Sequence, residues 1–234
     1  MNDKEEKRQI IVPGETIVSG DEYLPGEGAR REGEDIVASK YGIVDISEKL
    51  VRVVPLSGVY IPRRGNNVIG QVVDMNSAGW NVEFGSFVQG FLPISEVPFY
   101  VNRNELREHF DFDDMIFAKV SGTNGRSIDL SIKMRNLGKL DEGMVVRVNP
   151  HKVPRVIGKE GSMVNMIKDS TGCTISVGQN GFIWIKGEKI EDEVNTKKII
   201  MYICKNSSVK GLTEKVKTYI EKDLKLKIKE ENGN

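Results

Sequence analysis

Residues 154–168 read PRVIGKEGSMVNMIK, a helical apolar pattern that two glycines interrupt near its start. Gly158 and Gly161 bracket two charged residues, and glycine inside a helix costs about 0.5–1 kcal/mol relative to alanine. The interruption therefore predicts two helices joined by a loop whose backbone is partly stripped of side chains. Such a loop either only caps the two helices, with Ser162 as the second cap, or lets another chain approach closely.

The segments around this loop complete a β-α-α-β-β-α order. The expected elements are a strand in MVVRVNP (144–150), helices in HKVPRVIG (151–158) and SMVNMIKDSTG (162–172), a hairpin of CTISV (173–177) and FIWIK (182–186), and a helix from Glu191 to about Lys205. The hairpin turn, Gly178-Gln179-Asn180-Gly181, holds residues that tolerate positive φ. A lysine-rich amphipathic helix, LTEKVKTYIEKDLKLKIK (212–229), is expected to close the chain.

This order, with the glycine loop between the first two helices, resembles a type I KH domain over residues 143–205. The resemblance implies that the loop backbone lies against the phosphates of RNA, beside the positive N-terminal end of the next helix. Ile157 would then face the bases, and Glu160 would partly cancel the charge of Lys159. The RNA-binding residues implied here are Lys152, Arg155, Ile157, Gly158, Lys159, Glu160, Gly161 and Lys168.

Residues 63–138 predict an OB-fold, a five-stranded β-barrel. Five short apolar segments occur in this stretch, with a helical insert at 103–110, and barrel closure would leave no free sheet edges. The expected strands are VIGQVVDM (68–75), GWNVEFG (79–85), FVQGFLPI (87–94), DMIFAKVS (114–121) and SIDLSIK (127–133).

This segment resembles the OB-fold RNA-binding domain first described in a large ribosomal protein. Members of that family usually stack bases on aromatic residues, but the matching positions here are Ala78, Asn81 and Pro93. Trp80, Val82 and Phe84 alternate on the other face and are expected in the barrel core. Charge must therefore contribute more to RNA binding than stacking does. The candidate phosphate contacts, each of which is alternatively an ordinary solvated cation, are Arg63, Arg64, Lys119, Arg126 and Lys133.

Residues 1–62 predict a small all-β domain. IIVPGETIV (10–18), EDIVASKYGIVDI (34–46) and KLVRVVPL (49–56) are rich in Val and Ile and are separated by turn residues. The acidic, glycine-rich stretch at 20–35 is expected to form an exposed, mobile loop.

The charge of the chain is divided between its two ends. The formal net charge is 0, but residues 1–138 hold 16 Lys and Arg against 21 Asp and Glu, whereas residues 139–234 hold 18 against 13. The basic half is expected to bind a polyanion. No apolar run reaches the roughly 20 residues of a membrane span, so a soluble, cytoplasmic protein is expected.

The sequence predicts no metal site, no cofactor and no enzyme. Two cysteines and two histidines are too few and too scattered for a disulfide framework or a zinc site, and the acids at 111–114 are interpreted as a solvated turn. No phosphate-binding loop or nucleophile motif occurs.

All three domains, 1–62, 63–138 and 139–234, together resemble the RNA-binding cap subunit of the archaeal exosome. The most specific stretches are IIVPGE (10–15), VRVVPLSGVYIPRRGNNVIGQV (51–72) and the Gly178–Gly181 turn, which is interpreted as docked on a neighbouring domain. The resemblance implies three copies on a hexameric ring of phosphorolytic subunits, where each binds single-stranded RNA and feeds its 3′ end to the ring for 3′-to-5′ degradation. Residues 10–62 are the candidate ring-docking segment, with Val12, Pro13 and Gly14 at an extended edge.

Two other families remain as alternatives. One is a transcription-elongation factor that also places an OB-type domain before KH modules, although that family carries two KH domains and this chain has room for one. The other is a remnant of an RNA phosphorylase, in which the KH domain precedes the OB-type domain.

Overall fold

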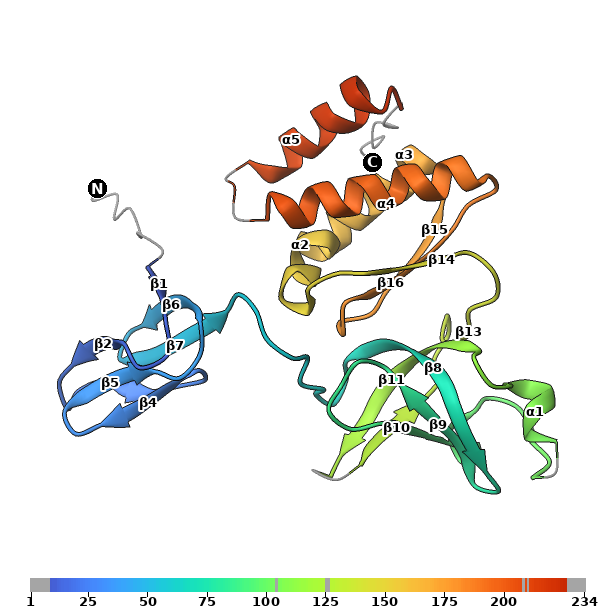
Figure 1. Ribbon diagram of the computed structural model, residues 1–234, viewed down its shortest axis with the longest axis horizontal. Coiled ribbons are helices and arrows are strands. Elements are labelled where there is room, and N and C mark those ends of the chain that lie inside the picture. The colour runs from blue at the N-terminus through green and yellow to red at the C-terminus, as the bar shows by residue number, and fades with distance from the viewer. Residues whose placement is uncertain (1–8, 104, 125–126, 208, 210, 227–234) are drawn as a thin grey trace. The chain divides into compact units, whose positions relative to one another are not determined.

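The computed structural model describes residues 9–103, 105–124, 127–207, 209 and 211–226. The chain forms two compact units, Met1–Gly58 and Val59–Asn234 (Figure 1). The first is an all-β unit, and the second joins a closed β-barrel to a domain of helices and a three-stranded sheet. The predicted fold class is confirmed. No helix within the described ranges is both long and apolar enough to span a membrane.

The first unit consists of two small sheets that enclose Ile11, Ala38 and Val53. One sheet has the order β1-β6-β7-β3 and the other the order β2-β5-β4. Their strands are β1 (Ile10–Ile11), β2 (Thr16–Ser19), β3 (Leu24–Pro25), β4 (Ala29–Glu32), β5 (Asp35–Ala38), β6 (Gly42–Ser47) and β7 (Leu50–Pro55).

The expectation of a loop at 20–35 is wrong, because this stretch contains β3, β4 and the start of β5. Its backbone is held against β7: the Gly26 N–H donates to the Val51 carbonyl at 2.8 Å, and the Val53 N–H donates to the Glu27 carbonyl at 2.9 Å. Gly28 has φ +79°, and a Cβ there would lie 2.6 Å from the Val53 carbonyl oxygen. The glycines in this stretch therefore allow its backbone to lie close to β7.

The second unit begins with the barrel. Its strands are β8 (Asn67–Asn76), β9 (Gly79–Glu83), β10 (Gly90–Pro93), β11 (Met115–Thr123) and β12 (Ile128–Ser131), with the short β13 (Gly138–Lys139) added to β11, and with a 3-10 turn (Ile94–Glu96) and α1 (Leu106–His109) between β10 and β11. β12 pairs parallel with β10 and antiparallel with β11, which closes the barrel.

The core of the barrel is built from the alternating residues that the sequence indicates. Trp80, Val82 and Phe84 are all 0% exposed, as predicted. The Trp80 indole Nε1–H donates to the Phe110 carbonyl at 3.0 Å, so its one polar group is satisfied inside the core. The side chains of these residues are therefore unavailable for stacking on RNA.

The remaining residues adopt the predicted β-α-α-β-β-α order. The elements are β14 (Met144–Arg147), a 3-10 turn (Pro150–Lys152), α2 (Val153–Ile157), a second 3-10 turn (Lys159–Gly161), α3 (Ser162–Thr171), β15 (Thr174–Val177), β16 (Phe182–Lys186), α4 (Ile190–Lys205), α5 (Leu212–Thr218) and a π-helical turn (Tyr219–Asp223). The sheet order is β14-β16-β15, and the helices pack on one of its faces (Figure 1).

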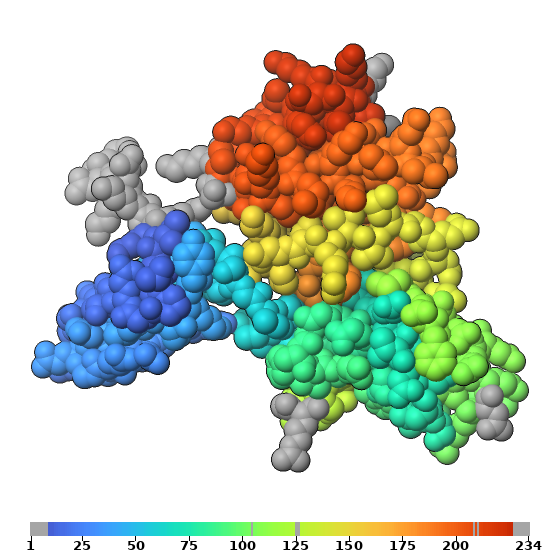
Figure 2. All heavy atoms as spheres, viewed as in Figure 1, coloured from blue at the N-terminus to red at the C-terminus, as the bar shows by residue number. Residues whose placement is uncertain are grey.

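The barrel and the sheet pack directly on each other within the second unit (Figure 2). Ile69, Phe117 and Trp184 are buried together at the junction. Asn180, in the β15–β16 turn, is 4% exposed; its amide donates to the carbonyls of Ile69 and Phe84 at 2.7 Å each, and its Oδ1 accepts the Ile69 N–H at 3.2 Å. The prediction that this turn docks on a neighbouring domain is confirmed.

Candidate nucleic-acid interface

The glycine loop between α2 and α3 has a backbone that side chains rarely tolerate. Gly158 has φ 76° and ψ 176°, and Gly161 has φ 83°. A Cβ at Gly158 would lie 2.7 Å from the Met163 backbone nitrogen, whereas a Cβ at Gly161 would meet nothing closer than 3.8 Å. Gly158 is therefore required because α3 comes too close for a side chain. Gly161 is required only by its positive φ, and the space beside it is open.

The alternative reading of the loop requires two helix caps, and the structure contains only the first of them. Gly158 follows α2 and donates its N–H to the Pro154 carbonyl at 3.0 Å, as a helix-ending glycine does. The expected cap at Ser162 does not form: α3 starts at Ser162, its capping residue is Gly161, and no side chain caps it. The first turn of α3 therefore presents its N–H groups without a side-chain acceptor.

Two of the predicted cations lie exposed beside the loop. Arg155 is on α2 and Lys159 is inside the loop, while Ile157 and Lys168 are half-buried. Glu160 is also exposed and has φ 54°.

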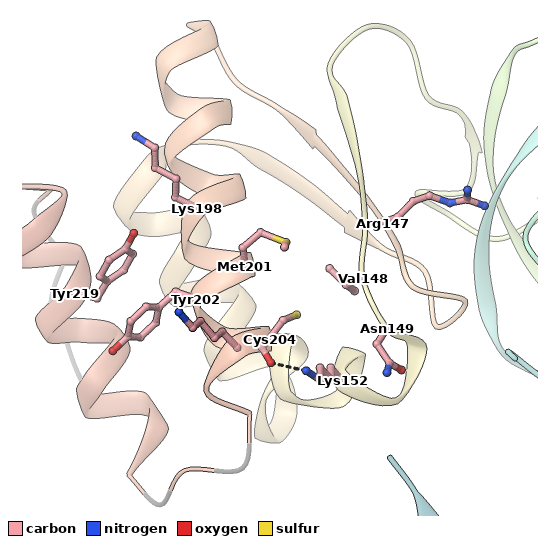
Figure 3. Close-up of a pocket in the computed structure, with 10 residues that line it drawn as sticks. Arg147, Val148, Asn149, Lys152, Lys198, Met201, Tyr202, Cys204 and Tyr219 are labelled. Atoms are coloured by element: carbon pink, nitrogen blue, oxygen red, sulfur yellow. Dashed lines mark hydrogen bonds between the residues drawn. The ribbon is translucent and has the colours of Figure 1, made fainter. Parts of the chain in front are cut away.

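Lys152 points away from the glycine loop. Its Nζ donates to the Cys204 carbonyl at 2.9 Å, at the C-terminal end of α4 (Figure 3). Its charge therefore stabilises a helix end, where cations are favourable.

The predicted barrel cations lie in different surroundings. Arg63 and Arg64 are exposed before β8. Lys119 places its Nζ 3.3 Å from the Met134 sulfur, and Lys133 forms an ion pair with Glu96 at 3.0 Å. Arg126 lies outside the described residues.

The Glu96 carboxylate predicts a measurable pH dependence. A hydrogen bond from Ser131, and then the hydrogen bond and charge of Lys133, hold the pKa of Glu96 below its ordinary value of 4.5. Because the folded-state pKa is depressed, the stabilisation is present above the unfolded-state pKa and is lost as the pH falls through the folded-state value. We expect Ser131→Ala and Lys133→Ala each to raise the pKa of Glu96, as measured by NMR titration. An unchanged pKa in both variants would contradict this assignment.

Sequence reasoning missed a group of exposed aromatic residues between β10 and β11. Tyr100 is 89% exposed, Phe99 stacks on His109 with ring centroids 4.8 Å apart, and the Arg107 guanidinium lies 5.1 Å from the centre of Phe112. The signal in the sequence is the adjacent aromatic pair Phe99 and Tyr100, which lies outside the strands expected to build the barrel core. Acidic residues in the same segment oppose phosphate binding there.

The predicted ring-docking residues form a turn, and the expected extended edge is wrong. Val12 is 51% exposed, and Pro13 and Gly14 follow it in a tight turn closed by the Glu15 N–H to the Val12 carbonyl at 3.2 Å. Gly14 has φ 90° and donates its N–H to the Ala38 carbonyl at 2.8 Å, which ties the turn to β5.

No cluster of three or more His, Cys, Asp or Glu suited to a metal ion occurs among the described residues. In the acidic turn before β11, Asp114 forms an ion pair with Lys139 at 2.7 Å, and Asp113 has φ 68°. These acids therefore belong to the turn and its contacts.

A KH domain family model matches residues 143–191. Exosome complex component Rrp4 of Methanobrevibacter smithii is 41% identical over 91% of this chain and 70% of its own length, and the same component of Pyrococcus furiosus is 40% identical over 92% and 83%. Rrp4 of Picrophilus torridus is 39% identical over 93% and 94%. A crystal structure assigned as an exosome complex RNA-binding protein superposes with a TM-score of 0.64 at 28% identity and covers 72% of this chain and 98% of its own.

Proposed function

The chain belongs to the Rrp4 family of exosome complex components, and we propose that it caps a hexameric ring of phosphorolytic subunits in three copies. In this role it binds single-stranded RNA and passes the 3′ end to the ring for 3′-to-5′ degradation. The chain is an accessory subunit and not an enzyme, and it acts in the cytoplasm. Family membership sets aside the transcription-factor and phosphorylase alternatives.

The observation that carries the RNA-binding part is the open side of the glycine loop. A Cβ placed on Gly161 would have no neighbour closer than 3.8 Å on that side, and Arg155 and Lys159 are exposed around it. A phosphate that approached the loop would meet backbone N–H groups, the start of α3 and two cations. Because Glu160 opposes phosphate, the site is expected to be moderate in affinity and sensitive to salt.

The barrel is proposed to add phosphate contacts more than base contacts. Arg63, Arg64, Lys119 and Lys133 are the described candidates, and the barrel aromatics Trp80 and Phe84 are buried. Contacts to phosphate do not read sequence, so the barrel is expected to bind RNA with little sequence preference.

Ring docking is proposed for the first unit, through one face of the β1-β6-β7-β3 sheet. Ile10 pairs with Ile43, and Ile43 pairs with Val54, so these three side chains lie in a row on one face. Ile10 and Val54 are 57% and 52% exposed, and an ion pair between Asp45 and Arg52 at 3.0 Å separates them from the exposed Leu50 and Leu24 on the same face. An apolar face of this kind on a small unit fits a protein partner better than RNA.

The test of RNA binding is the double variant Arg155→Glu with Lys159→Glu. We expect its affinity for fluorescent poly(A) to fall by about tenfold at low salt, because two phosphate contacts become repulsive. The slope of log K against log salt should decrease by about 1.4, since each single-strand phosphate contact contributes about 0.7.

Lys189→Glu with Lys197→Glu is the matched control, because it changes the charge equally at exposed lysines of α4 and its N-cap, outside α2 and the glycine loop. This control should retain most of the parent affinity and its slope. An Arg155→Glu, Lys159→Glu variant with an unchanged slope would move the RNA-binding surface off the glycine loop.

A further inference from the structure

A hollow of about 690 Å³ lies on the KH domain between the end of β14 and helices α4 and α5 (Figure 3). Cationic side chains contribute to its lining: Arg147, Lys152, Lys198 and Lys205. Among the described residues that line it there is no carboxylate. None of the lining residues comes from the glycine loop or α3, so the hollow is separate from the site proposed above.

The charge of the hollow comes mainly from Lys198 and Lys205, because Lys152 is bonded to the end of α4. The Arg147 guanidinium lies over the Phe182 ring, 4.4 Å from its centre, and in Figure 3 it points away from the hollow. Lys198 and Lys205 are exposed on α4. Seven residues of helix span about 10.5 Å, so a ligand that meets both amines must carry negative charge at more than one point.

An apolar side chain of α4 adjoins these lysines. Met201 follows Lys198 by three residues and precedes Lys205 by four, so all three share one face of α4. Met201 is 48% exposed and points toward Val148, whereas Lys198 and the stacked pair Tyr202 and Tyr219, 4.2 Å apart, lie toward α5 (Figure 3). Methionine adapts its shape to planar partners, so the Met201 surface suits a flat ring.

The end of α4 does not repel an anion here. The last carbonyls of a helix carry partial negative charge, but Lys152 donates to the Cys204 carbonyl at 2.9 Å and offsets it. Burial raises the pKa of the Cys204 thiol, so no thiolate adds negative charge.

We propose that this hollow is a second RNA contact, in which the lysines hold phosphates and the Met201 surface receives a base. The proposal rests on the proposed function, because RNA held at the glycine loop of the same domain reaches the hollow at high effective concentration. A volume of about 690 Å³ is within the range of sites that hold nucleotide-sized ligands. An acidic peptide would need clustered acids to match the lysines, whereas RNA carries a charge at every nucleotide.

The test compares Lys198→Glu, Lys205→Glu with Lys197→Glu, Lys215→Glu in the full chain. Both double variants change the charge equally at exposed lysines of α4 and the helix after it, but Lys197 and Lys215 do not line the hollow. The probes are fluorescent oligo(A) of four nucleotides, the length that a glycine loop holds, and of about 16 nucleotides. We expect the hollow variant to bind the long probe about tenfold more weakly and the short probe as the parent does, while the control binds both normally.

A second measurement places the RNA directly. A photo-reactive amino acid at position 201 should cross-link the long probe and not the short one. Equal weakening by both double variants, or unchanged binding of the long probe with no cross-link, would overturn the proposal. Loss of binding to a glutamate-rich peptide, with RNA binding intact, would also overturn it and assign the hollow to a protein partner.

These results separate the two proposals. If Arg155→Glu, Lys159→Glu still weakens RNA binding while the hollow variant does not, the second contact fails and the proposed function stands. If the parent chain binds neither probe, the proposed function fails and this inference fails with it.

Discussion

Asn180→Ala is expected to lower the free energy of unfolding by about 2–4 kcal/mol, because buried polar groups lose their partners. The Asn180 amide satisfies the carbonyls of Ile69 and Phe84, and its oxygen accepts the Ile69 N–H. The site is buried where two domains meet, so water cannot replace all three bonds without opening the junction. The loss should appear as a lower urea midpoint, with the slope of the transition unchanged.

Asn124→Ala is the control, since its amide makes a single exposed contact with Asp129 at 3.5 Å. This variant should change the free energy of unfolding by less than about 0.5 kcal/mol. Amide exchange at Ile69 gives a local measure, and it should accelerate in Asn180→Ala alone. A stability loss no larger than that of the control would mean that the turn does not hold the barrel and the KH domain together.

Ile10→Glu with Val54→Glu is expected to prevent assembly with the phosphorolytic ring. The two side chains flank Ile43 on one exposed sheet face, so both carboxylates would enter a contact that buries apolar surface. Unpaired charge buried at an interface costs several kcal/mol, and each ring would have to accept it at three sites. Light scattering after gel filtration should show a ring with three copies of the parent chain, and the ring alone with the variant.

Val73→Glu with Ile190→Glu is the control for this experiment. Both residues are exposed apolar side chains in the second unit, at 37% and 76%, so the added charge is equal and lies outside the proposed docking face. This control should assemble as the parent does. A fully assembled Ile10→Glu, Val54→Glu variant would remove the sheet face from the docking surface.

Local patterns predict most of the second unit because they act between neighbours in the chain. The alternation of Trp80, Val82 and Phe84 places one face of β9 inside the barrel, and all three are fully buried. The glycine pair at 158 and 161 places a loop between α2 and α3. In both cases the side-chain period sets which residues can share an apolar face.

The stretch at 20–35 shows where the same reasoning fails. Its acids and glycines are typical of a loop, but the backbone pairs with β7 more than twenty residues later. Strand formation in such a segment depends on a distant partner that composition does not reveal. The extended edge predicted at Pro13 and Gly14 is wrong for a local reason: Pro-Gly favours a turn, and the Glu15 N–H closes that turn on the Val12 carbonyl at 3.2 Å.

For the candidate site too, the sequence predicted some features and not others. Residue types near the glycine loop indicate a phosphate-binding surface, and Arg155 and Lys159 are exposed there. The partners of the other cations were beyond prediction: Lys152 bonds to Cys204, 52 residues away, and Lys133 pairs with Glu96, 37 residues away.

By itself the sequence determined the order of the elements around the glycine loop, the buried face of β9 and the loop itself, because these follow from side-chain period and backbone freedom within a few residues. Only the tertiary structure decided that Asn180 joins two domains, that Lys152 serves a helix end and that lysines gather around the hollow beside Met201. Each of these depends on groups brought together from distant positions, and charge or hydrogen-bonding capacity in the sequence does not specify which partner will satisfy it.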